Sequence, residues 1–190
     1  MISYSLVMSK DVAAITAELE QIGSEARGMF GTLTPEQVNW KPAPESWSIG
    51  QCLDHLIKSN ELFFGDMDKI AAGTRQNSFW ENWSPFTSFF GGLVISSLEN
   101  DGRKSKASAV ATPPSDVPGD IVERFVEHQD KVADKVRAIQ GTDWSKVVLT
   151  SPFLPLMTYS LEDGSRILTV HERRHLRQAK RVMESEGFPR

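Results

Sequence analysis

The sequence has few of the features that tie a protein to an oxidising compartment, a membrane or a nucleic acid. Its 190 residues contain one cysteine, Cys52, which excludes an intrachain disulfide. No apolar run approaches the roughly 20 residues that cross a bilayer, and the first residues lack the pattern of a signal peptide. The net charge of −4 provides no basic field for a phosphate backbone. We therefore expect a cytoplasmic protein that binds neither membranes nor nucleic acids.

The remaining composition is that of an ordinary globular protein. With 39% hydrophobic and 24% charged residues, the chain is long enough for one domain with a sizeable core and short for two. We expect a single domain over residues 1–190. The basic clusters in residues 103–106 and 173–181 are interpreted as solvated surface. Cys52 falls on the apolar face of a predicted helix and is interpreted as a small core residue.

Four long amphipathic helices are predicted from apolar residues that recur at spacings of three and four. They cover about residues 8–31, 49–72, 118–140 and 160–186. Ser48 and Gln51 form a capping box at the start of the second helix, and Ser160 and Asp163 have a similar form at the start of the fourth. A short turn of helix is expected after Thr34. Since no alternating strand pattern is present, the predicted fold is all-α, a four-helix bundle with a long crossover between helices two and three.

The crossover, residues 73–116, divides into two parts. Residues 79–90 are dense in aromatic side chains and are predicted to pack over an open end of the core. A short helix is expected at about residues 87–98. Residues 99–112 are small and polar, which makes them the best candidates for disorder.

His171 and His175 are the strongest functional signal in the chain. They lie four residues apart on the apolar, inward face of the last predicted helix. Side chains at this spacing stand about 5–6 Å apart at Cβ, which suits two ligands of one metal ion. The alternative is a pair of buried, hydrogen-bonded histidines that bind nothing. A third ligand would distinguish the two interpretations.

Four polar residues near these patterns are candidates for additional site residues. His55 lies on the flank of the second helix's apolar stripe, where it can still reach a neighbouring helix. His128 is interpreted as a surface or boundary residue, and Glu172 as a solvated charge. Gln178, one turn beyond His175 on the inward face, is a candidate to orient an imidazole or a bound water.

The segment from His171 to His175 also spells His-Glu-x-x-His, the zinc-protease motif in which the glutamate is the general base. That class needs a third ligand downstream. Only 15 residues follow His175, and Glu184 and Glu186 lie on the same predicted helix. A continuing helix cannot fold back to complete the site, so the protease interpretation is set aside.

The combined pattern resembles the DinB-like superfamily of metal-binding four-helix bundles. The resemblance spans roughly the whole chain. It rests on Trp40 with Pro42, on Trp47 to Gln51 followed by His55, on His171 to Gln178, and on Phe188 with Pro189. In that family one histidine of helix two and two of the last helix bind a divalent metal. The resemblance implies that His55, His171 and His175 bind a divalent metal, Zn²⁺ or Ni²⁺ first of all, and leave positions open for water or substrate.

Family members with known activity are similar to metal-dependent transferases that join a low-molecular-weight thiol to an electrophile, and others to hydrolases. The resemblance thus implies an enzyme that activates a thiol or water toward a small-molecule substrate, with no further catalytic residue assigned. Residues 79–90 would then either wall an apolar pocket for the electrophile or simply finish the core. The second hypothesis is a non-catalytic, metal-binding stress-response bundle that acts as a binding or regulatory module. In either case we expect a homodimer formed through exposed helix faces.

Overall fold

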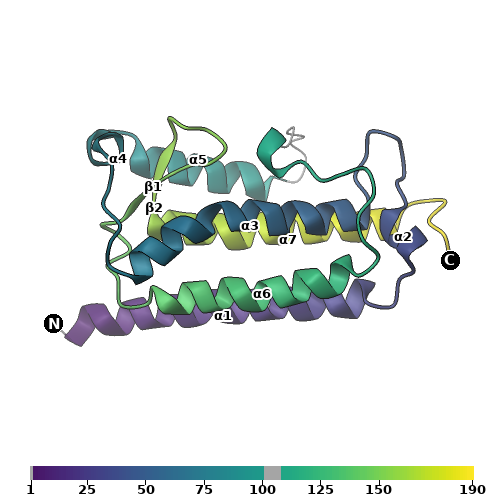
Figure 1. The fold of residues 1–190 in the computed structure, drawn as a ribbon, viewed down its shortest axis with the longest axis horizontal. Helices are drawn as coiled ribbons and strands as arrows, with labels where there is room; N and C mark the ends of the chain where they lie inside the picture. The colour runs from purple at the N-terminus through teal and green to yellow at the C-terminus, as the bar shows by residue number, and fades with distance from the viewer. Residues whose placement is uncertain (1, 101–107) are drawn as a thin grey trace.

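Four long helices form a bundle in the computed structural model, which describes residues 2–100 and 108–190, with side chains from residue 12 onward except that of residue 88. They are α1 (Ile2–Phe30), α3 (Ile49–Ala71), α6 (Ile121–Ala138) and α7 (Leu161–Met183). Helices α1 and α3 each pack against both α6 and α7. Helices α1 and α7 run in one direction and α3 and α6 in the other (Figure 1). The predicted all-α bundle is confirmed, as is the long crossover, which lets α3 and α6 run parallel.

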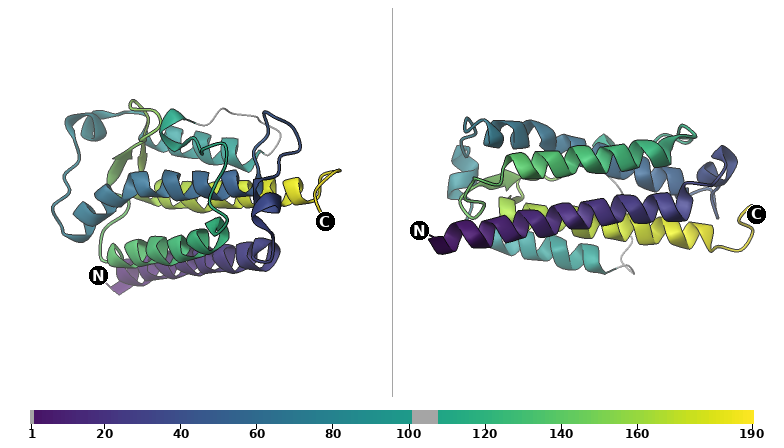
Figure 2. Two further views of the ribbon diagram at one scale, coloured as in Figure 1. Left: turned by 45° about the vertical axis from the view of Figure 1, so that its right-hand side comes forward. Right: turned by 90° about the horizontal axis from the view of Figure 1, so that it is seen from below.

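The shorter helices lie at both ends of the bundle and along its outer side (Figure 1). Helix α2 (Pro35–Asn39) follows α1 and is capped by Thr34, as expected. The crossover contains α4 (Phe79–Trp83), α5 (Thr87–Glu99) and the 3₁₀ turn η1 (Ala109–Ala111). Helix α5, which was predicted, packs against α7 outside the four long helices (Figures 1 and 2). Helix α7 is therefore covered on three sides, by α1, α3 and α5.

The helix starts follow the capping residues seen in the sequence. The Ser48 hydroxyl accepts a hydrogen bond from the Gln51 N–H, and the Gln51 side-chain oxygen accepts one from the Ser48 N–H. At the start of α7 the Ser160 hydroxyl accepts a hydrogen bond from the Asp163 N–H. Cys52 lies in the first turn of α3, free and fully buried, which confirms it as a core residue. Among the described residues, no helix combines the length and the apolarity needed to span a bilayer.

A two-stranded antiparallel sheet was missed in the sequence. Strands β1 (Val148–Thr150) and β2 (Thr158–Ser160) pair with Leu149 opposite Tyr159. Strands of three residues are too short to show the alternation that identifies a strand. The sheet lies at the start of α7, against α5 and beside the end of α3 that is farthest from α2 (Figure 1).

The expectation of disorder in residues 99–112 was wrong where the structure describes this stretch. Glu99 ends α5, and residues 109–111 form η1, which contacts α3. Ala111 is fully buried there. Residues 101–107, with the basic cluster at 103–106, lie outside the described residues. The small, polar residues of this stretch did not indicate that η1 is structured, because η1 is held by its contacts with α3.

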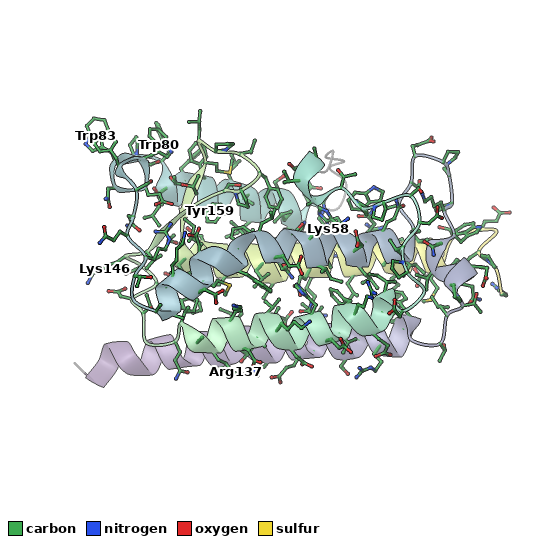
Figure 3. All side chains as sticks on the ribbon, in the orientation of Figure 1. Lys58, Trp80, Trp83, Arg137, Lys146 and Tyr159 are labelled. Atoms are coloured by element: carbon green, nitrogen blue, oxygen red, sulfur yellow. The ribbon has the colours of Figure 1, made fainter. Side chains whose placement is uncertain are left out.

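The aromatic residues 79–90 do not cover the core, contrary to the prediction. Phe79 is 81% exposed and Trp83 is 73% exposed, and their rings stack on each other. Figure 3 places Trp80 and Trp83 at the outer edge of α4. The residue of α4 that is buried is Glu81, which pairs with Arg75 at 2.8 Å. Polar contacts therefore hold α4 in place and leave its aromatic rings on the surface.

Candidate metal centre

Three histidines from two helices converge at the interface of α3 and α7. Each of His55, His171 and His175 offers a ring nitrogen, and these nitrogens lie within 4.8 Å of one another. The His55 ring centroid is 5.2 Å from that of His171 and 4.7 Å from that of His175. His55 is buried and the two histidines of α7 are half-buried. The structure thus brings together all three residues named from the sequence.

A backbone carbonyl of the crossover orients the His55 ring. The Nδ1 atom of His55 lies 2.7 Å from the Ala111 carbonyl oxygen, so Nδ1 carries the proton and donates it in this bond. The lone pair of Nε2 then faces α7, where the Nε2 atom of His171 lies 3.3 Å away. Fixing the free nitrogen of a histidine in this way is typical of metal ligands. Sequence reasoning missed Ala111, because nothing local marks a carbonyl that acts across the fold.

Trp47 forms one wall of the histidine cluster. Its ring stacks on His175 with centroids 5.6 Å apart and an interplanar angle of 24°. It also contacts His55 at a centroid distance of 4.9 Å. The indole ring therefore covers that side of the two imidazoles. In the sequence Trp47 was visible only as part of the motif before His55.

All three imidazoles are uncharged near neutral pH. Burial is the main cause, and the neighbouring His55 a smaller one, of a His171 pKa lowered to about 3. Burial is also the main cause of the lowered pKa of His55 and of His175. A hydrogen bond between His175 and Gln178 acts in the opposite sense and raises the pKa of His175, so the side chain weighed as an orienting residue contacts an imidazole of the cluster. Neutral imidazoles keep the lone pairs that metal binding requires.

The donor set fits a divalent transition metal. Nitrogen ligands held at about 2.0–2.1 Å around a tetrahedral ion stand about 3.3 Å from one another, which matches the 3.3 Å between the Nε2 atoms of His55 and His171. The Nδ1 atom of His175 is buried without a hydrogen-bond partner among the described residues, as expected for a nitrogen available to an ion or to solvent. Imidazole suits zinc, nickel, copper and iron rather than magnesium or calcium.

Glu172 is fully buried, which corrects its interpretation as a solvated charge. Its Oε1 atom accepts hydrogen bonds from Asn60 Nδ2 at 2.8 Å and from Gln129 Nε2 at 3.3 Å. Burial raises the pKa of the carboxyl to about 7. The side chain faces α3 and α6, and sequence reasoning failed here because helix α7 is covered on three sides. Since Glu172 is bonded within the bundle, it does not act as the exposed base of the protease motif.

His128 is also buried, although it was interpreted as a surface or boundary residue. It is 3% exposed, and its ring stacks on Phe64 with an interplanar angle of 17°. Burial lowers its pKa to about 4. A side chain at the edge of an apolar stripe becomes internal when a large ring from the next helix covers it. His128 lies outside the three-histidine cluster.

Two arginines of the cluster at residues 173–181, which was interpreted as solvated surface, bind to neighbouring helices instead. Arg173 pairs with Glu18 at 2.6 Å and with Glu25 at 2.5 Å, which fastens α7 to α1. Arg174 donates to the carbonyl oxygens of Ser97, Leu98 and Asn100 at the end of α5. A cation at the carbonyl end of a helix is favourable. These two side chains therefore hold the helices on both sides of α7.

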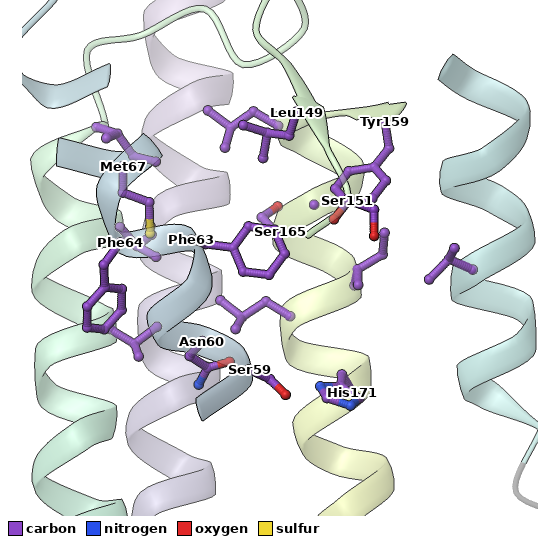
Figure 4. A pocket seen from close by; sticks show the side chains of 18 of the residues that line it. Ser59, Asn60, Phe63, Phe64, Met67, Leu149, Ser151, Tyr159, Ser165 and His171 are labelled. Carbon is purple, nitrogen blue, oxygen red and sulfur yellow. The ribbon is translucent and has the colours of Figure 1, made fainter. Parts of the chain in front are cut away.

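A cavity of about 170 Å³ adjoins the histidine cluster (Figure 4). His171 and Ser59 lie at one end of it, and the Ser59 hydroxyl is 3.5 Å from the Nε2 atom of His55. Its apolar walls come from α3, α5, α6, α7 and the sheet. Walling such a pocket was one of two interpretations of residues 79–90, and none of the described side chains of that segment lines the cavity. Helix α5 contributes Val94 and Leu98 instead.

Comparison with known proteins identifies a family. The model of the DinB superfamily matches residues 18–179, which contain all three histidines of the cluster. The searches of curated proteins and of solved structures gave no match. The family match covers most of the chain and agrees with the helical bundle and with the histidine cluster seen in the structure. The chain therefore belongs to the DinB superfamily.

Proposed function

We propose that this chain is a metal-dependent enzyme in which His55, His171 and His175 bind one divalent ion, Zn²⁺ or Ni²⁺. The observation that supports the proposal is the convergence of three neutral imidazoles whose donor nitrogens lie within 4.8 Å of one another. Three protein ligands leave positions open, as in catalytic rather than structural metal sites. An ion held there lowers the pKa of a thiol or of water and so supplies a nucleophile near neutral pH.

The groups around the histidines have separate roles in binding the metal and the substrate. Ala111 holds His55 in the tautomer that presents Nε2 to the centre. Trp47 keeps water from one side of the cluster through its stacking on His175. The cavity beside His171 accommodates part of a small-molecule substrate. This arrangement supports either transfer of a low-molecular-weight thiol to an electrophile or hydrolysis of a small substrate.

The first experiment measures metal content in protein without a histidine tag. After reconstitution with zinc or nickel, wild type is expected to retain about one equivalent, and His171→Ala to lose it. His128→Phe is the matched control, because it removes a buried histidine outside the cluster and should retain the metal. Less than about 0.1 equivalent in the wild-type protein would contradict the proposal.

The second experiment measures turnover. Metal-loaded protein is supplied with cysteine, glutathione or coenzyme A and an electrophile, or with an activated ester and water. We expect turnover with at least one pair, lowered at least about 100-fold in His171→Ala and unchanged in His128→Phe. Metal binding without turnover across this panel would favour the non-catalytic binding module instead.

A further inference from the structure

We infer that the cavity beside His171 binds an uncharged, apolar group about the size of one aromatic ring, and that the substrate of the metal centre carries such a group. The claim that the substrate carries this group rests on the proposed function. The binding property itself rests on the cavity alone. It follows from the size of the cavity, from the chemistry of its walls and from the hydrogen bonds already made there.

The size of the cavity admits one ring and little more. Its volume is about 170 Å³. A cavity of about 150 Å³ lined by aliphatic and aromatic side chains accepts benzene in another protein. Because His171 forms one end of the cavity, a ring bound inside it lies beside the histidine cluster. A substituent on that ring can then reach the donor nitrogens.

The walls of the cavity exclude charge. Among the described residues that line it there is no Asp, Glu, Lys or Arg. Phe63, Phe64, Trp144 and Phe153 contribute aromatic rings to the wall, together with aliphatic side chains. A carboxylate or an ammonium group placed there would lose its hydration without gaining a partner, which is strongly unfavourable. The cavity therefore selects a neutral group.

The polar groups of the wall are largely engaged within the protein. The Ser165 hydroxyl donates to the Glu162 carbonyl oxygen at 2.7 Å. Ser151 is hydrogen-bonded to Tyr159, and the Asn60 amide donates to Glu172. The body of the cavity thus offers apolar contact rather than free hydrogen-bonding groups.

This distribution fixes how a substrate lies. In Figure 4 the Ser59 hydroxyl and the His171 ring gather at one end, and Phe63 projects into the middle. An apolar group fills the body of the cavity, so the reactive, polar atom lies at the His171 end. A neutral aryl or branched alkyl electrophile has this shape.

Binding is tested first without any metal, so that it does not depend on the proposed function. Chelator-treated wild-type protein is titrated with toluene and with benzoate, its charged counterpart, by ligand-observed NMR. Val94→Phe on α5 adds a ring to the cavity wall. Leu93→Phe is the matched control, because Leu93 is the neighbouring residue, is 46% exposed and does not line the cavity.

We expect toluene to bind wild type and Leu93→Phe with affinities within about twofold, and to bind Val94→Phe at least about tenfold more weakly. Benzoate should bind the wild-type protein at least about tenfold more weakly than toluene. The comparison of toluene with benzoate uses only the wild-type protein. It therefore still tests the inference if circular dichroism shows that Val94→Phe does not fold. Absence of toluene binding, or equal binding of toluene and benzoate, would overturn the inference.

The substrate part is tested with zinc-loaded enzyme, a thiol and either benzyl chloride or 4-(chloromethyl)benzoate. The thiol sulfur bonds to the benzylic carbon, chloride leaves, and the thiol proton passes to solvent. We expect kcat/KM to be at least about tenfold higher for the neutral substrate. Equal values would overturn the assignment of the cavity to the substrate. Toluene binding by a protein that retains no metal after reconstitution with zinc would leave the apolar site standing and contradict the proposed function alone.

Discussion

Buried polar side chains from three helices meet next to the histidines of α7. Asn60, Gln129 and Glu172 form one hydrogen-bonded group that joins α3, α6 and α7. Glu172 directly follows His171, and Asn60 lies five residues after His55 on α3. Because an unpaired buried polar group costs about 1–3 kcal/mol, these bonds favour one alignment of the three helices. That alignment sets the distance between the histidines of α3 and α7.

His128 is a buried polar residue of a different kind. Its Nε2 atom has no hydrogen-bond partner among the described residues. Burial lowers its pKa from 6.5 to about 4, so between these values the unfolded chain binds a proton on His128 and the folded chain does not. The contribution of the neutral ring to stability is therefore present above pH 6.5 and is lost as the pH falls toward 4.

We predict that His128→Phe removes this source of acid sensitivity. Phenylalanine can keep the stacking on Phe64 and cannot be protonated. In metal-free protein the variant should lie within about 1 kcal/mol of wild type at pH 7 and be more stable than wild type by about 2 kcal/mol at pH 5. Urea denaturation at both pH values measures the difference. A stability difference that is the same at pH 5 and pH 7 would show that His128 does not titrate in this way.

At the scale of elements, the first turn of α3 brings the crossover onto the helix that carries His55. A Cβ atom at Gly50 would lie 2.3 Å from Val117 Cγ2 and 2.8 Å from Val38 Cγ1. Glycine is therefore required for the segment before α6 to lie this close to α3. The same segment includes η1, whose Ala111 carbonyl orients His55.

We predict that Gly50→Ala lowers the free energy of unfolding by about 1–3 kcal/mol, because the added methyl group displaces Val117 or Val38. Gly65→Ala is the matched control on the same helix, where a Cβ atom meets nothing within 4 Å. That control should stabilise the protein by about 0.5–1 kcal/mol through helix propensity. Chemical denaturation of both variants tests the contrast, and a Gly50→Ala protein as stable as Gly65→Ala would refute the close approach.

The sequence was most informative where a pattern is local. Helical periodicity and the caps at Ser48 and Ser160 predicted the long helices, and the spacing of His171 and His175 predicted their shared inward face. The sheet, η1 and the burial of Glu172 and His128 were missed. Each depends on which neighbour the folded chain places beside it, as Phe64 beside His128, and a single helix pattern does not contain that information.

Across the whole molecule, a polar layer separates two apolar halves of the bundle. The hydrophobic core consists of two clusters of side chains. On α3 the core residues before Asn60 belong to the first cluster and those after it pack in the second. The core residues of α6 divide between the two clusters at Gln129, and those of α7 at Glu172. The histidines lie beside this layer, and the cavity extends from His171 into the half that contains Trp144 and Tyr159. The fold thus places a polar, metal-ligating group at the end of an apolar pocket.

X-ray absorption spectroscopy of zinc-reconstituted, tag-free protein tests the shared metal centre most directly. The predicted spectrum has three imidazole nitrogens at about 2.0–2.1 Å around one zinc per chain, and it loses imidazole scattering in His55→Ala. A zinc shell with fewer than three imidazoles in the wild-type protein, or one that His55→Ala leaves unchanged, would contradict a metal centre built from both α3 and α7.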